Sequence, residues 1–140
     1  MPRSAPILAL VAVLAVAGCT TQGSSNDSSG KFTGDQRLVA NTVEDFESAA
    51  SKGDQDEICR DLLAKPLVAQ FAKQGGSCEQ AVDSTLKDTD SFGLTVESVA
   101  INGNQAVAHV KADRGKKDVA RTLTLVKEGN GWRISEFGSG

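Results

Sequence analysis

The feature that most constrains the fold is a single change in the spacing of apolar residues, which falls near Phe92-Gly93. Before this point apolar side chains recur every three or four residues, a spacing typical of helices with one buried face. Beyond it they alternate with polar side chains, as in strands with one buried face. The order predicts an α+β domain in which N-terminal helices pack on one face of a four-stranded antiparallel sheet.

Two helices are predicted in the first part of the domain. The first covers residues 35–50 and ends at Gly53, a residue suited to a helix C-terminus. Asp54 can cap the second helix, which stops before Pro66. The residues expected on their buried stripes are Val39, Val43, Phe46, Ala50, Ile58, Leu62 and Leu63.

Two shorter helices are predicted next. The third carries Leu67, Val68 and Phe71 inward and closes at Gly75-Gly76. The fourth covers residues 78–86, and Ser77 and Gln80 form a capping box at its start, which marks a helix N-terminus.

The alternating region predicts four strands joined by short turns, which makes an antiparallel meander. The strands are expected at residues 94–101, 105–112, 119–127 and 132–137. The turns are expected at Asn102-Gly103, Arg114-Gly115 and residues 129–131.

The side chains can be assigned to the two faces if every turn has an even number of residues, because a slip of one residue inverts a strand. The apolar interior face then carries Val99, Ile101, Ala106, Ala108, Val110, Leu123, Leu125, Trp132 and Ile134. Glu97, Arg121 and Glu136 fall on the same interior face. The outer face carries Leu94, Val96, Val107, His109, Lys111, Thr122, Thr124 and Arg133.

Cys59 lies on the second predicted helix and Cys78 at the start of the fourth. In a protein outside the cytoplasm an even pair of cysteines predicts a disulfide, here one that joins the two helices. A metal site is not expected, because two thiols and one distant histidine do not form a ligand set.

The N-terminus has the order of a bacterial export signal. Arg3 is followed by an apolar stretch that is shorter than the roughly 20 residues of a membrane span. Val16-Ala17-Gly18-Cys19 resembles the lipobox, which implies cleavage after residue 18 and a lipid on Cys19. An ordinary signal peptide with a chance cysteine is the alternative.

The segment that follows, residues 19–34, is rich in Ser, Thr, Gly and Asn and is predicted to be a flexible tether. The order of segments is therefore a signal peptide at 1–18, a lipidated cysteine with its tether at 19–34 and one domain at 35–140. We expect the protein on the extracytoplasmic face of the cell membrane. The net charge of −3 argues against nucleic-acid binding, which needs a basic face.

Helices followed by a four-stranded meander that ends in "GNGWRISEF" resemble the nuclear transport factor two superfamily of SnoaL-like cone folds. The likeness is closer to small actinobacterial lipoproteins of that group, on "ICRDLL", "GGSCEQAV" and "GWRISEF". It covers residues 36–137 and implies a curved sheet. Members include isomerases, hydrolases, ligand binders and partner-binding modules, so the fold does not choose among them.

Catalytic members of that group place acids and tyrosines inside the cone, and this chain has no tyrosine. Its single histidine, His109, is expected on the outer face, so no catalytic residues and no cofactor are predicted. The candidate ligand-binding residues are Glu97, Arg121, Glu136 and Trp132. An arginine between two carboxylates could hold a polar head group at an apolar pocket. The alternatives are a salt-bridged rim for the three charged residues, a buried carboxylate among them that acts as a general base, and core packing for Trp132.

The sequence thus favours a non-catalytic lipoprotein that binds a small apolar or amphipathic ligand. The alternative is an interaction module that docks an envelope protein through its outer sheet face, which could also form a homodimer. Leu94, Val96 and Val107 are the large apolar residues expected on that face.

Overall fold

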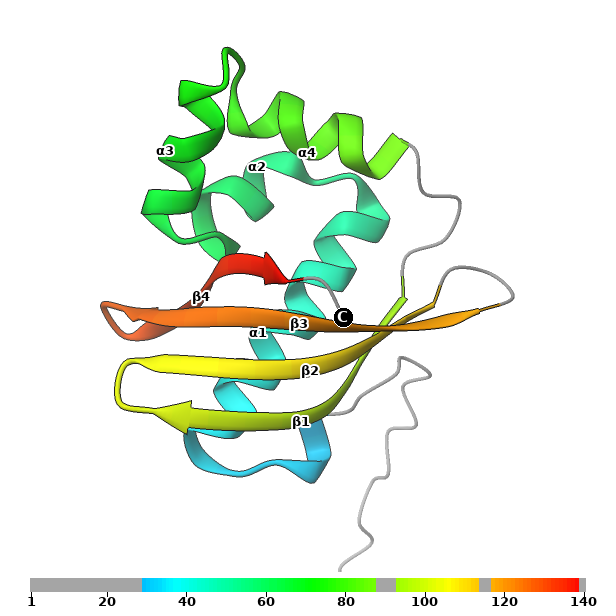
Figure 1. Ribbon diagram of the computed structural model, residues 1–140, viewed down its shortest axis with the longest axis vertical. Coiled ribbons are helices and arrows are strands. Elements are labelled where there is room, and N and C mark those ends of the chain that lie inside the picture. Colours follow the sequence, from blue (N-terminus) through cyan, green and yellow to red (C-terminus); the bar gives the residue numbers. More distant parts are fainter. Residues whose placement is uncertain (1–28, 88–92, 114–116, 139–140) are drawn as a thin grey trace, which may run out of the picture.

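The computed structural model describes residues 29–87, 93–113 and 117–138 (Figure 1). The predicted signal segment, the lipobox and Cys19 lie outside these residues. The elements in chain order are η1 (Ser29–Lys31), α1 (Gly34–Lys52), α2 (Gln55–Glu57), η2 (Ile58–Leu62), α3 (Lys65–Lys73), α4 (Cys78–Lys87), β1 (Gly93–Asn102), β2 (Gln105–Asp113), β3 (Asp118–Glu128) and β4 (Gly131–Gly138). This arrangement confirms the α+β class.

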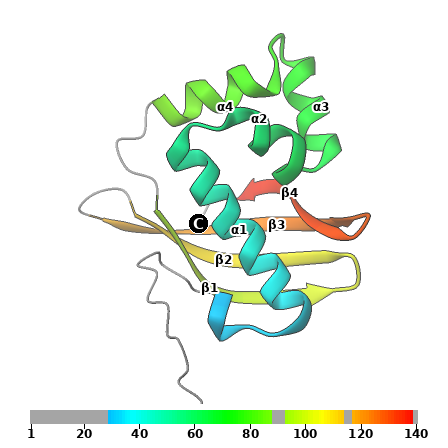
Figure 2. The same ribbon diagram turned by 180° about the vertical axis from the view of Figure 1, so that it is seen from behind.

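The long helix α1 lies across one face of the sheet, as Figure 2 shows. Its buried stripe includes Val39, Val43 and Phe46, as the apolar spacing predicts. The helix ends at Gly53, whose φ of 69° is left-handed and whose N–H binds carbonyl groups of the last turn. Before α1, the short turn η1 extends the described fold to Ser29, and Phe32 packs against the core.

The second predicted helix is shorter than expected. Asp54 caps α2 as predicted, since its carboxylate accepts the Glu57 N–H at 3.0 Å. The chain then widens into the π-helical turn η2, and Leu63 leaves the helix to form a parallel bridge with Ile134. The Ala64 N–H donates to the Ile134 carbonyl at 2.8 Å. Pairing with β4 therefore satisfies backbone groups that a longer helix would otherwise use.

The next two helices follow the prediction closely. Pro66 lies in the first turn of α3, where its missing N–H costs nothing. The capping box of α4 is confirmed, because the Ser77 N–H donates to Gln80 Oε1 and the Gln80 N–H to Ser77 Oγ, both at 3.2 Å. Helices α2, α3 and α4 gather beyond the β4 edge of the sheet (Figure 1).

The four strands form one antiparallel sheet in the order β1-β2-β3-β4. Two β-bulges interrupt its pairing. In β1 the register shifts between Val96 and Ser98, which leaves Glu97 as the extra residue. In β4 it shifts between the partners of Thr124 and Leu125, which leaves Ser135 as the extra residue. Each bulge reverses the inward and outward alternation of the strand beyond it.

The bulges overturn four of the predicted face assignments. Leu94 and Val96 were expected outside, but they are buried with 4% and 0% exposure. Glu97 and Glu136 were expected inside, but both are exposed. The face assignment assumed only that every turn has an even number of residues, and this assumption does not detect an extra residue within a strand.

The buried residues form one cluster contributed by α1, η2, α4 and all four strands. Ile58, Leu63, Leu125, Ile134, Val39, Val43, Val96 and Val110 are the largest of its fully buried side chains. The described segments therefore close a single core between them, as an independently folding domain does.

Candidate functional site

A cavity of about 520 Å³ lies between the helices and the inner face of the sheet. Its walls are mostly apolar and come from α1, α3, α4 and all four strands. The lining residues are Phe46, Leu63, Phe71, Ala81, Val82, Thr85, Leu86, Gly93, Leu94, Val110, Ala112, Asp113, Arg121, Leu123, Phe137 and Gly138. Three of them are phenylalanines, and the Phe46 and Phe137 ring centroids are 5.5 Å apart.

The two bulges decide which side chains line this cavity. Beyond the bulge in β4, Phe137 pairs with Leu123 and lines the cavity beside it. On the N-terminal side of the bulge in β1, Leu94 pairs with Ala112 and also lines the cavity. The face assignment from the sequence did not identify either residue as part of the cavity. The apolar character of Leu94 and Val96 was the signal against their outward assignment, and the apolar character of Phe137 was a signal for an inward one.

Arg121 is the one candidate charged residue that lines the cavity. It lies on the inner face of β3 opposite Val110, as predicted, and it is partly buried. Within the described ranges no carboxylate lies within the 4.0 Å of an ion pair with its guanidinium, and no hydrogen bond to this side chain is present. Asp113 lines the same cavity at the end of β2 without pairing with it.

The two candidate carboxylates lie on the opposite side of the sheet. Glu97 forms an ion pair with Lys111, with its Oε1 2.9 Å from Lys111 Nζ. The hydrogen bond that Lys111 donates to Glu97 and the negative charge of Glu97 raise the pKa of Lys111. Glu136 lies opposite Thr124 on the outer face. The predicted cluster of one arginine between two carboxylates is therefore not formed.

Trp132 belongs to the core and is not among the residues that line the cavity. Its side chain is 3% exposed, and Lys127 Nζ lies 5.7 Å from its ring centroid. The Thr42 hydroxyl donates to the Trp132 carbonyl at 3.3 Å, which ties α1 to β4. These contacts favour the core-packing interpretation.

His109 is exposed on the outer face, where its Nδ1 lies 3.4 Å from Thr122 Oγ1. Within the described ranges no group of three His, Cys, Asp or Glu side chains is placed to hold a metal ion. None of the helices in those ranges is long and apolar enough to cross a membrane.

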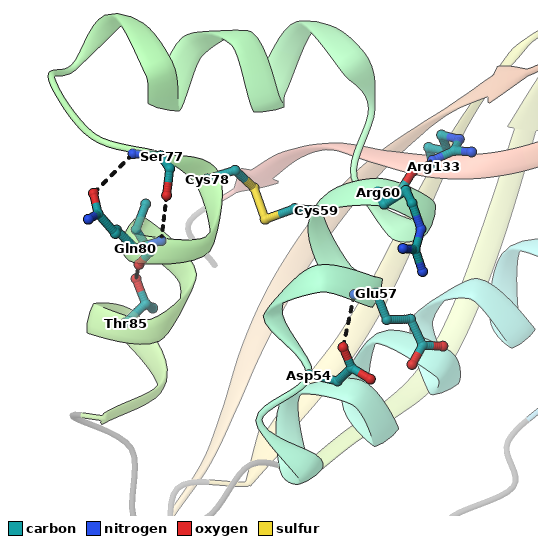
Figure 3. Close-up of a disulfide and its surroundings, with 10 residues drawn as sticks. Asp54, Glu57, Cys59, Arg60, Ser77, Cys78, Gln80, Thr85 and Arg133 are labelled. Carbon is teal, nitrogen blue, oxygen red and sulfur yellow. Dashed lines mark hydrogen bonds between the residues drawn. A yellow bond between two sulfur atoms is a disulfide. The ribbon is translucent and has the colours of Figure 1, made fainter.

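A disulfide holds the wall that α4 contributes to the cavity. Cys59 in η2 and Cys78 at the start of α4 are bonded, with their Cα atoms 6.0 Å apart, as the sequence predicts (Figure 3). Both residues are buried, and the capping box lies directly beside the bond. The bond fixes the N-terminal end of α4, whose Ala81, Val82 and Leu86 line the cavity.

Glu47 follows Phe46 in α1 and is half-buried. Desolvation raises the pKa of its carboxyl group, the Leu94 backbone N–H that hydrogen-bonds to it lowers the pKa, and the neighbouring Glu44 charge raises it further. The net shift is upward, so burial outweighs the hydrogen bond.

Comparison with protein families gives a match over most of the chain. Residues 34–136 match the model of the family described as "Putative lumazine-binding". Searches of curated proteins and of solved structures each found no match. The matched segment runs from the start of α1 to Glu136 in β4 and so includes nearly the whole domain and most of the cavity wall. The chain therefore belongs to this family.

Proposed function

We propose that the domain binds a small apolar or amphipathic molecule in the cavity between its helices and sheet. The observation that carries the proposal is the cavity itself, because about 520 Å³ with apolar walls is within the range of small-molecule sites. The family description supports the same conclusion. A lumazine is a flat bicyclic ring, and the phenylalanines of the cavity offer surfaces against which flat rings can pack.

The chemistry of the lining supports binding rather than catalysis. Among the described lining residues there is no histidine, tyrosine or cysteine, and the polar side chains are Thr85, Asp113 and Arg121. Asp113 and Arg121 form no ion pair with each other, so they do not make a coupled acid and base. We therefore assign the cavity a non-catalytic role.

The proposal includes a lipid anchor on Cys19 that holds the domain at the outer face of the membrane. The lipobox-like sequence and the polar segment after it support the anchor. The disulfide between Cys59 and Cys78 supports an oxidising compartment, since such bonds are rare in cytosolic proteins. The docking alternative loses support, because Leu94 and Val96 face the core instead of the outer surface.

The test is a titration with N-phenyl-1-naphthylamine, an uncharged dye that fluoresces in apolar surroundings. The protein would be a chain that starts at Thr20 and is exported so that the disulfide forms. This chain retains the whole described core, which runs from Val39 to Ile134. We expect saturable binding of one dye per chain. A folded chain that gives no saturable binding would contradict the proposal.

A matched pair of variants locates the site. Ala81→Phe places a ring into the cavity from α4, whereas Ser84→Phe places the same ring on the exposed side of that helix. Binding at the cavity predicts that Ala81→Phe weakens dye binding and that Ser84→Phe does not. Equal effects of the two variants would place the dye elsewhere.

A further inference from the structure

The position of Arg121 in the sheet suggests what kind of ligand the cavity selects. On the inner face Val96, Val110 and Arg121 form one row across β1, β2 and β3, since Val96 pairs with Val110 and Val110 with Arg121. Val96 and Val110 are 0% and 1% exposed. Arg121 therefore extends a row of buried valines, and its side chain reaches the cavity.

The β-bulges leave this cation without a partner in the described part of the chain. Without them Glu97 and Glu136 would share its face, and each bulge instead turns a carboxylate to the outside. An unpaired guanidinium remains stable where water solvates it, but taking it out of water without a counter-charge is costly. A neutral ligand that filled the cavity would impose that cost, whereas a ligand with an anionic group would offset it.

The surrounding charges also limit the ligand to one negative charge. Arg121 is the only cation among the described residues that line the cavity, and Asp113 lines it as well. A second negative charge on the ligand would have no counter-ion and would be repelled by Asp113.

We propose that the cavity is selective for a monoanionic amphiphile, with Arg121 pairing with the anionic group while Phe71, Leu123 and Phe137 enclose the apolar body. This inference rests on the proposed binding function and adds the chemical class of the ligand. Carboxylates and sulfonates share the required chemistry, so the charge and not the acid type defines the class.

Two dyes that differ only in the anionic group test the proposal. 8-Anilinonaphthalene-1-sulfonate is N-phenyl-1-naphthylamine with one added sulfonate, so the ratio of their dissociation constants isolates the contribution of the charge. A hydrogen bond to a charged group contributes about 1.5–3 kcal/mol, so we expect the wild-type chain to bind the sulfonate at least roughly tenfold more tightly than the neutral dye.

Variants of Arg121 attribute this preference to a residue. Arg121→Gln should weaken binding of the sulfonate by at least about tenfold and leave the neutral dye bound as well as before or better. Arg121→Lys should retain part of the preference, because it keeps the charge but not the planar guanidinium. The control is Arg60→Gln, which removes the same charge from an arginine whose side chain is 71% exposed. It should leave both affinities unchanged.

The outcomes separate the inference from the function on which it rests. If a folded chain binds neither dye, the binding function fails. If it binds both equally and Arg121→Gln changes neither affinity, the function stands and the charge selectivity is overturned. If Arg121→Gln and Arg121→Lys weaken both dyes alike, Arg121 has only a structural role and the inference is also overturned.

Alkyl ligands of equal length then test the limit to one charge. Decanoate carries one negative charge, decanol none and decyl phosphate nearly two at pH 8. We expect decanoate to displace the neutral dye at lower concentration than either of the others. Asp113→Asn should reduce the difference between the concentrations of decanoate and decyl phosphate that displace the dye. Tighter binding of decyl phosphate to the wild-type chain would overturn the single-charge assignment.

Discussion

Phe137 and Glu136 are neighbours in β4 and point to opposite faces of the sheet, as successive strand residues do, and the bulge at Ser135 decides which of the two faces inward. Phe137 lines the cavity and contacts Phe46, whereas Glu136 lies on the outer face opposite Thr124. The composition of the cavity therefore depends on the bulge as much as on the sequence of the strand.

A pair of alanine variants tests this assignment. Phe137→Ala removes an aromatic wall and should weaken binding of N-phenyl-1-naphthylamine by about fivefold to tenfold, which corresponds to about 1–1.4 kcal/mol. Glu136→Ala should leave the dye affinity unchanged, because its side chain is exposed on the other face. Fluorescence titration of both variants measures the difference. A larger loss for Glu136→Ala would show that the strand has the register without a bulge.

Much of this fold could be predicted from the sequence, but the two bulges could not. Apolar spacing identified the helices and the meander, since it reflects which faces the solvent reaches, and local capping chemistry located Asp54 and Ser77 correctly. The disulfide followed from the cysteine count. Residue spacing alone does not reveal a bulge, because the position of the extra, unpaired residue depends on how the strand pairs with its neighbour.

The bulges explain which of the candidate site residues were assigned to the wrong face of the sheet. Arg121 was placed on the interior face correctly, because no bulge separates it from Val110 on β2. Glu97 is itself a bulge residue and Glu136 lies beyond one, so the same argument failed for both. Trp132 was assigned the correct face, but the cavity lies at the other end of β4, next to Phe137.

The half-buried carboxyl of Glu47 predicts a pH dependence of stability. Its pKa is raised from 4.5 by desolvation, so the native state keeps this proton to a higher pH than the unfolded chain does. The native state then binds more protons, and the contribution of Glu47 to the free energy of unfolding falls as the pH rises above about 4.5.

Glu47→Gln should remove this loss while keeping an oxygen that can accept the Leu94 N–H. We expect the variant to be more stable than the wild type at pH 7 by less than about 1 kcal/mol, because the group is partly solvated. The difference should shrink at pH 4. Urea unfolding at the two pH values measures both numbers, and a variant that is less stable at pH 7 would contradict the sign.

The proposed anchor predicts that the lipid depends on Cys19 alone. In a bacterial host supplied with an alkyne analogue of palmitate, the full-length chain should incorporate the label and sediment with the membranes. Cys19→Ala should abolish the label and leave Cys59 and Cys78 free to form their disulfide. Label that persists in Cys19→Ala would show that the lipid is attached to another residue and would contradict the proposed anchor.

The disulfide should stabilise both the domain and its cavity. Cys59 and Cys78 are separated by 19 positions, and closing a loop of this size contributes roughly 3 kcal/mol in the chain-entropy model. We expect Cys59→Ala/Cys78→Ala to lose about that much in urea unfolding. Because the bond holds the end of α4, the variant should also bind N-phenyl-1-naphthylamine more weakly even where it is fully folded.

Reduction provides the matched control for the double variant. Dithiothreitol should lower the stability and the dye affinity of the wild-type chain and leave those of Cys59→Ala/Cys78→Ala unchanged, since the variant has no bond between these helices to reduce. If reduction lowered stability but not dye affinity, α4 would keep its place without the bond. The packing of Val82 and Leu86 against the cavity would then hold this wall, and the disulfide would contribute only to stability.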